Sequence, residues 1–163
     1  MPGRRDFHKI IIGRSEAMSF VDPAILHVPA KTDTGAYRSA IHASDIFIDK
    51  EGFLNFTLFG NHPIFNNIAI KSKTNKFQEV FVANSFGHRE ARYEVKLKVK
   101  LGPKVFFATF SLADRSKKIY PILLGRKLLN GRFLVDSDKS SVNRLELKEK
   151  YSIKMPGDEE DGR

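Results

Sequence analysis

Two adjacent segments of this chain alternate apolar and polar residues with the period of a β-strand. Between Arg92 and Leu101 every second residue is apolar, and the residues between them are lysines or Glu94. A period of two gives a strand one face in the core and one face in water. Gly102-Pro103 then turns the chain into a second apolar segment, residues 105–112. Together they predict a β-hairpin with one solvent-exposed face.

The rest of the chain shows further short apolar segments separated by turn residues. Strands are also expected at residues 25–30, 39–48, 53–59, 63–70 and 77–83. The best helix signal is short, at residues 126–130, and Gly131 follows it in the position that suits a left-handed C-terminal residue. Many short strands with one short helix predict an all-β fold, a closed β-barrel.

The length and composition favour one compact domain. The chain has 163 residues, of which 41% are hydrophobic, which is enough to bury a single core. We expect an N-terminal arm over residues 1–9, one domain over 10–154, and a disordered acidic tail over 155–163. The apolar segment at 10–12 is too short for a signal peptide, and no segment is long enough to span a membrane. A cytoplasmic protein without membrane contact is therefore expected.

Several kinds of chemistry have no support in the sequence. The chain has no cysteine, which excludes a disulfide framework, a cysteine nucleophile and a thiolate metal site. Its five histidines are scattered, whereas a catalytic zinc needs three convergent ligands. Neither a His-Glu-x-x-His helix nor a phosphate-binding Gly-x-x-x-x-Gly-Lys loop occurs. We expect no metal and no cofactor.

The motif with the clearest chemistry is Asp33-Thr34-Gly35-Ala36, which follows a short apolar segment. An aspartic protease presents its catalytic carboxylate in this way. The same tripeptide also forms ordinary turns, because Asp binds nearby backbone and Gly tolerates positive φ. A second motif, Leu123-Leu124-Gly125-Arg126, is similar to the hydrophobic-hydrophobic-Gly element of the retropepsins, although alone it reads as a buried strand leading into a helix. Both motifs in this order favour a protease.

The sequence around both motifs resembles one retropepsin-like aspartic protease family, which is associated with ATP-grasp α-L-glutamate ligases of the RimK type. Members of that family have carried the label ATP-dependent zinc protease. The similarity covers about residues 10–137, and its matching segments are 11–14, 28–36, 39–43, 84–93, 112–116, 123–126 and 131–136. It implies a retropepsin-like barrel with a flap hairpin, endopeptidase activity on α-linked polyglutamate or another acidic peptide, and a functional link to a glutamate ligase.

The resemblance also assigns the catalytic residues. Hydrolysis of a peptide without metal needs two carboxylates that share a proton, and the chain has one Asp-Thr-Gly. We therefore expect a homodimer that pairs the two Asp33 side chains across its axis. Thr34 is expected to form hydrogen bonds between subunits, and Gly35 to admit close packing. The second motif is expected to support the catalytic loop through the following residues: Leu123, Leu124, Gly125 and Arg126.

One departure from the retroviral enzymes affects this second motif. Tyr37 stands where those enzymes have an acidic residue, and Arg38 follows it. The ion pair between that acid and the Arg of the Gly-Arg element therefore cannot form. The sequence leaves the role of Arg126 open.

The flap is expected between Val80 and Tyr93, although a plain surface hairpin fits the same residues. A net charge of +9 favours an anionic substrate, and arginine binds carboxylates through two parallel hydrogen bonds. The residues expected to contact substrate are Ala36, Arg38, His42, Asn84, Ser85, Gly87, His88, Arg89 and Arg92. Lys31 is a further candidate, and His42 fits a packed core histidine better than a ligand.

Two alternatives stay open. A basic, non-catalytic binding module for nucleic acid or an acidic peptide would use Lys96, Lys98 and Lys100 along one strand. Nucleic acid is the less favoured partner, because lysines on an edge strand also prevent aggregation and the phenylalanines lie in apolar segments. The second alternative is a retropepsin-like scaffold that has lost its activity.

Overall fold

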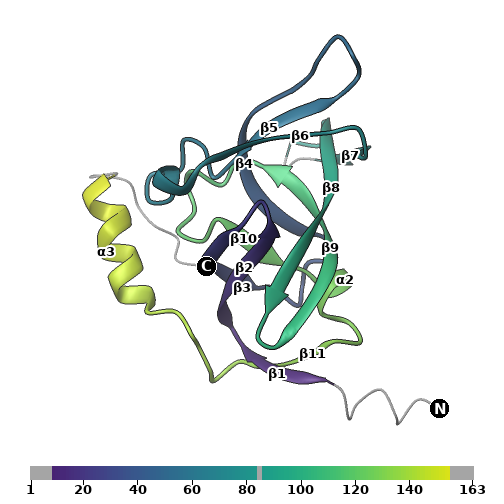
Figure 1. Ribbon diagram of the computed structural model, residues 1–163. Coiled ribbons are helices and arrows are strands. Elements are labelled where there is room, and N and C mark those ends of the chain that lie inside the picture. Colours follow the sequence, from purple (N-terminus) through teal and green to yellow (C-terminus); the bar gives the residue numbers. More distant parts are fainter. Residues whose placement is uncertain (1–8, 84–85, 155–163) are drawn as a thin grey trace, which may run out of the picture.

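The structure is a computed structural model that describes residues 9–83 and 86–154. Six strands close into a barrel at its centre (Figure 1). These strands are β2 (Ser15–Asp22), β3 (Ile25–Thr32), β4 (Ser39–Ile48), β8 (Arg89–Leu101), β9 (Lys104–Ala113) and β10 (Ile122–Leu124). The ring closes because β10 pairs with both β3 and β4. The prediction of an all-β closed barrel is confirmed.

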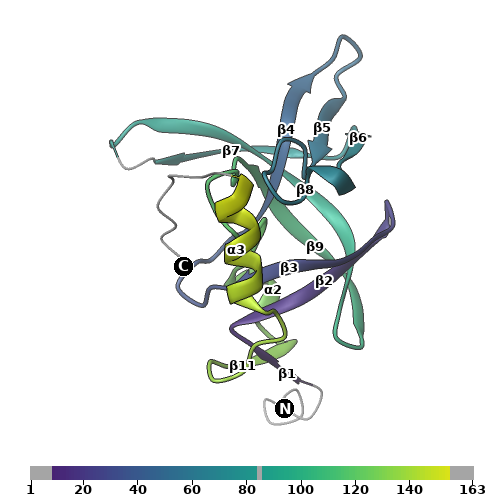
Figure 2. The same cartoon turned by 90° about the vertical axis from the view of Figure 1, so that its left-hand side faces the viewer.

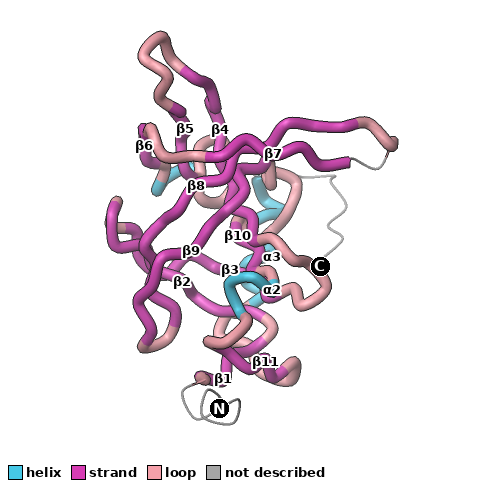
Figure 3. The backbone as a smooth tube through the Cα atoms, turned by 90° about the vertical axis from the view of Figure 1, so that its right-hand side faces the viewer, coloured by secondary structure: helices cyan, strands magenta, loops and turns pink. Residues whose placement is uncertain are grey.

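Two hairpins extend from the barrel (Figure 3). One joins the far half of β4 to β5 (Leu54–Leu58), which pairs with β6 (Ile70–Thr74). The other joins β7 (Gln78–Ala83) to the first half of β8. The strands predicted at 25–30, 39–48, 53–59, 77–83, 92–101 and 105–112 are confirmed within a few residues. The predicted flap is thus a hairpin that projects from the body.

The strand predicted at residues 63–70 is wrong. These residues form turns and a short 3-10 helix, η1 (Asn66–Ile68), and pairing begins only at Ile70. Backbone N–H groups in this segment bond to nearby side chains and not to a neighbouring strand. Asn66 Oδ1 accepts the Asn61 N–H. His62 Nδ1 accepts the Ile64 N–H. Such local bonds between side chain and backbone compete with a ladder.

A small parallel sheet and two helices complete the fold. β1 (Ile10–Gly13) pairs with β11 (Phe133–Asp136), and α2 (Arg126–Leu129) confirms the predicted short helix. The expectation of a single helix is wrong, because α3 (Arg144–Lys154) lies against the side of the molecule (Figure 2). Its buried residues are only Leu147 and Tyr151, one helical turn apart, while Leu145 is 72% exposed. So narrow an apolar stripe gives little sequence signal.

Most core side chains lie inside the barrel, and a smaller cluster around Tyr120 joins α3 to the body. No helix in the described ranges is long and apolar enough to cross a membrane. The predicted arm and acidic tail fall almost wholly outside these ranges, so the domain boundaries stay a prediction.

Candidate active site

Asp33 follows the last residue of β3, at the point where β3 runs beside β10. Its backbone N–H donates to the carbonyl of Leu124 over 2.9 Å, which ties the turn to β10. Its carboxylate Oδ1 accepts the Gly35 N–H at 2.9 Å. Asp33 is half-buried, whereas Thr34 and Gly35 are exposed. The carboxylate is therefore held in one direction at the rim of the barrel, beside an open loop edge.

The second motif packs against this loop. The N–H groups of Arg126 and Lys127 donate to the carbonyls of Ala36 and Tyr37 at 2.8 and 3.0 Å. These are N–H groups from the start of α2, which have no partner inside the helix. Gly125 donates its own N–H to the buried Ser39 hydroxyl at 2.9 Å. Strand β10, Gly125 and α2 thus fix the loop that carries Asp33.

Gly125 permits an unusually close approach of two backbones. A Cβ at this position would lie 2.5 Å from the carbonyl oxygen of Arg38 and 2.7 Å from that of Tyr37. Real Cβ atoms essentially never come this close to another heavy atom. Glycine is needed here because a Cβ does not fit. The backbone conformation does not require it, since a φ of −93° and a ψ of 175° suit any residue.

The role of Arg126, which the sequence left open, is visible in the structure. Its guanidinium donates to the carbonyl of Thr34 at 3.1 Å and lies over the Tyr37 ring, 5.8 Å from the ring centroid. Tyr37 therefore offers a cation–π contact where retroviral enzymes have an ion pair. The intersubunit role of the exposed Thr34 stays a prediction.

Arg38 also has a partner that sequence reasoning missed. Its guanidinium donates a short hydrogen bond to Glu94 on β8. Glu94 was expected on the wet face of its strand but is only 5% exposed, while the Arg38 side chain is 44% exposed. Strand alternation breaks here, since Glu94 and Val95 are both buried. A lysine-rich, alternating strand contains no signal for a buried acid.

His42 lies in the core of the fold. Its ring is 2% exposed; Nε2 donates to the Gly60 carbonyl at 2.7 Å and Nδ1 accepts the Arg115 N–H at 2.8 Å. The His62 ring packs edge-on against the His42 ring, with 5.2 Å between the ring centroids. It forms the same two kinds of hydrogen bond: Nε2 donates to the Lys118 carbonyl, and Nδ1 accepts the Ile64 N–H. We therefore assign His42 to the fold and leave it out of substrate contact.

This histidine pair predicts acid instability. Burial lowers the pKa of His62 from 6.5 to about 4. Burial also lowers the pKa of His42, against the opposing effects of its hydrogen bond to the Gly60 carbonyl and of the nearby Asp114. The unfolded chain then binds more protons than the folded chain below pH 6.5. The free energy of unfolding therefore has its full value above pH 6.5 and decreases as the pH falls toward 4. His62 alone accounts for a decrease of about 3 kcal/mol.

Urea unfolding at a series of pH values measures this loss. Replacing His62 with Gln, which keeps a donor and an acceptor, should flatten the dependence between pH 6.5 and 4. His27→Asn, a change at an exposed ring, is the control. An unfolding free energy that is constant over this range would contradict the prediction.

The remaining substrate candidates lie on the β7–β8 hairpin. Asn84 and Ser85 fall outside the described residues. Gly87 is exposed with a φ of 80°, and His88 is exposed next to it. Arg89 lies over the ring of Phe81, 5.0 Å from the centroid, and Arg92 Nε donates to Glu90 at 3.0 Å. The contacts of both arginines are within the hairpin, so their action on substrate stays a prediction.

Across residues 9–83 and 86–154, no three His, Asp or Glu side chains converge as metal ligands would. The expectation of metal-independent chemistry stays a prediction, which a chelator tests directly.

Comparison with known proteins adds two relatives. Both are named "Probable alpha-L-glutamate ligase". The one from Shewanella halifaxensis is 29% identical over 153 residues, 90% of this chain, and the one from Parasynechococcus marenigrum is 30% identical over 134 residues, 81% of this chain. The chain spans about a third of the length of these relatives, 33% and 29% respectively.

A solved structure and a family match extend over most of the chain. The crystal structure of a protein with unknown function from Legionella pneumophila subsp. pneumophila has a TM-score of 0.63 and 29% identity, covering 80% of this chain and 95% of that one. Residues 11–146 match the family described as "RimB-like: Retropepsin-like aspartic endopeptidase RimB". The segments 33–36 and 123–126 and the barrel fall within this match. The chain belongs to the RimB-like family of retropepsin-like aspartic endopeptidases.

Proposed function

We propose that the protein is an aspartic endopeptidase that acts as a homodimer, with a water held between two Asp33 carboxylates. The observation that carries this proposal is the Asp33 turn, where Gly35 orients the carboxylate and the loop edge is open. A second copy meeting this edge would bring the two carboxylates together. Close carboxylates cannot both ionise comfortably, so they share one proton.

The shared proton gives the two groups different tasks. The ionised carboxylate takes a proton from the water as its oxygen attacks the peptide carbonyl carbon, and the protonated carboxyl donates to the carbonyl oxygen. A proton then passes to the amide nitrogen, and the C–N bond breaks. The fixed backbone around the loop keeps both groups in place during these steps.

The proposed substrate class is α-linked polyglutamate or another acidic peptide. The chain carries 28 Lys and Arg against 19 Asp and Glu, and its relatives are named as glutamate ligases. Arg38 lies on the same loop as Asp33, and with 44% of its side chain exposed it has donors left for a substrate carboxylate. Glu94 fixes its direction. In this proposal Arg38 would recognise an acidic side chain close to the reacting bond. The names of the relatives support a functional link to a glutamate ligase.

Mutation should separate the contribution of Arg38 to stability from its contribution to substrate binding. Arg38→Gln leaves Glu94 buried without its partner, so we expect a loss of about 1–2 kcal/mol of stability and about tenfold weaker binding of glutamate oligomers. The double variant Arg38→Gln, Glu94→Gln removes the lone charge and should recover most of the stability, but not the binding. Thermal unfolding and fluorescence anisotropy measure the two quantities. Binding that recovers together with stability would show that Arg38 has only a structural role.

A chelator experiment tests the reaction. Wild-type protein should cleave α-linked polyglutamate in excess chelator and leave polyglutamine intact, with products identified by mass spectrometry. Activity that is lost with chelator and returns with zinc alone would overturn the metal-free mechanism.

The charge of +9 and the ligase names of the relatives also support a second candidate, a module that binds an acidic tail without cutting it. That module would bind polyglutamate equally well as wild type and as Asp33→Asn, and neither form would release products. Steeply salt-dependent binding of nucleic acid by both forms would point to the nucleic-acid variant of this candidate.

A further inference from the structure

A cavity of about 850 Å³ opens beside the catalytic loop, between the base of the β7–β8 hairpin and the outer face of β8 and β9. Three lysines from separate parts of the chain line it: Lys76 just before β7, Lys96 on β8 and Lys127 on α2. Neither Asp33 nor Arg38 is among its lining residues. The cavity is therefore separate from the proposed reacting centre.

Two lining residues connect the cavity to the Asp33 loop. Lys127 donates its backbone N–H to the Tyr37 carbonyl at 3.0 Å. Glu94, also in the lining, holds the Arg38 guanidinium. The walls of the cavity are thus attached to the same loop that carries Asp33 and Arg38.

The charge in the cavity is positive. Lys76, Lys96 and Lys127 are exposed, and within the described ranges none of them forms a salt bridge. The acidic lining residue, Glu94, is already neutralised by Arg38. The 62% exposed ring of Phe107 offers an apolar surface beside them. The lysine ammonium groups can bind the carboxylates of glutamate side chains, and the apolar surface of Phe107 can contact their methylene groups.

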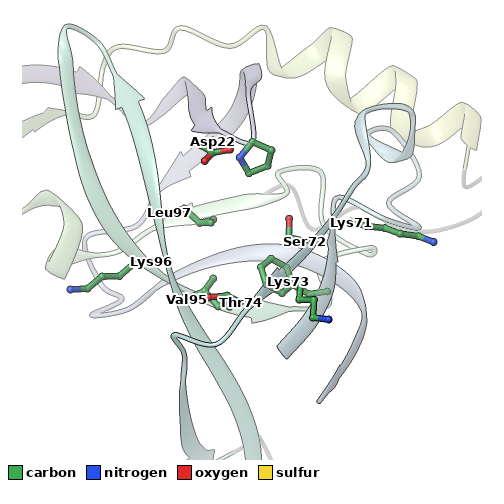
Figure 4. A pocket seen from close by; sticks show the side chains of 10 residues that line it. Asp22, Lys71, Ser72, Lys73, Thr74, Val95, Lys96 and Leu97 are labelled. Atoms are coloured by element: carbon green, nitrogen blue, oxygen red, sulfur yellow. The ribbon is translucent and has the colours of Figure 1, made fainter. Parts of the chain in front are cut away.

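A second cavity, of about 340 Å³, lies on the other side of β8 (Figure 4). In this view Leu97 and Ser72 point into that cavity, whereas Lys96 points away from it. Lys96 is in the lining of both cavities, and the direction of its side chain in this view is away from the smaller one.

We propose that the larger cavity is a subsite for acidic side chains that lie several residues from the scissile bond, with Lys76, Lys96 and Lys127 as its specificity-determining residues. This inference rests on the proposed function. It adds that affinity depends on substrate length, because only a long glutamate oligomer reaches from the Asp33 loop into the cavity.

Binding tests this subsite independently of catalysis. The protein carries Asp33→Asn, so that no cleavage occurs, and fluorescein-labelled glutamate oligomers of short and long chain length are measured by anisotropy at low salt. The triple variant Lys76→Gln, Lys96→Gln, Lys127→Gln should bind the long oligomer about tenfold more weakly and the short one unchanged. The triple variant Lys50→Gln, Lys100→Gln, Lys148→Gln is the matched control, since it removes the same charge at exposed lysines outside the cavity.

Two results would overturn the proposal. One is equal affinity of the cavity variant and its parent for the long oligomer. The other is an equal loss in the control triple variant, which would indicate unspecific charge attraction. A third result is that the wild-type protein cleaves nothing while the cavity variant still loses affinity for the long oligomer. That result would support the subsite and contradict the proposed hydrolysis.

Discussion

Asp33→Asn is expected to lower hydrolysis of α-linked polyglutamate by at least about a thousandfold while leaving the fold intact. General acid and base catalysis together account for an effect of this size, and Asn can supply neither. The fold survives because Asn Oδ1 can accept the same Gly35 N–H that Asp33 Oδ1 accepts. Initial rates and thermal unfolding measure the two parts, and the change in unfolding free energy should stay within about 0.5 kcal/mol.

Asp138→Asn is the control for this variant. Asp138 is exposed in the turn after β11, far along the chain from the catalytic loop, and should keep wild-type rates. An Asp33→Asn protein that is folded and still cleaves at the wild-type rate would remove Asp33 from the mechanism.

Gly125→Ala is expected to reduce stability by at least about 2 kcal/mol and hydrolysis by about a hundredfold. The new Cβ would lie 2.5 Å from the Arg38 carbonyl oxygen, which is backbone and cannot rotate away. The loop must therefore move. The hydrogen bonds from Arg126 and Lys127 to Ala36 and Tyr37 pull against that movement. Asp33 precedes Ala36 and Tyr37 by three and four residues on the same loop, so we expect it to be displaced as well.

Gly52→Ala separates this steric effect from the general effect of replacing a glycine. Gly52 has a φ of 85° and no atom within 4 Å of an added Cβ, so its cost is backbone strain of about 1 kcal/mol. Its hydrolysis rate should be unchanged. If Gly125→Ala lost no more stability than Gly52→Ala, the close packing of loop and β10 would not matter for the fold.

The sequence predicted the barrel and the position of the Asp33 turn beside Gly125 because both follow local rules. The catalytic role of Asp33 stays a prediction. Alternation between Arg92 and Leu101 sets the buried face of β8, where Leu97, Val99 and Leu101 are in the core as expected. Gly125 marks a place where two backbones approach closely, which a side chain would prevent. Gly35 closes the turn by donating its N–H to the Asp33 carboxylate.

Contacts between distant segments could not be predicted in the same way. The partner of the buried Glu94 is Arg38, 56 residues away in the chain, and no local pattern specifies that pair. The turns after Asn61 form because side chains bond to nearby backbone, which an apolar pattern misses. α3 depends on two side chains that pack against Tyr120 and Ile119. In each case tertiary context decides the local structure.

The central claim is that two subunits share one catalytic pair of Asp33 carboxylates, and mixing subunits tests it most directly. Wild-type protein is unfolded and refolded with increasing amounts of Asp33→Asn at constant total concentration, and hydrolysis of α-linked polyglutamate is measured. If the pair is shared, mixed dimers are inactive and the rate falls with the square of the wild-type fraction. A rate that falls in direct proportion to that fraction would show that each subunit cleaves alone, and would contradict the account.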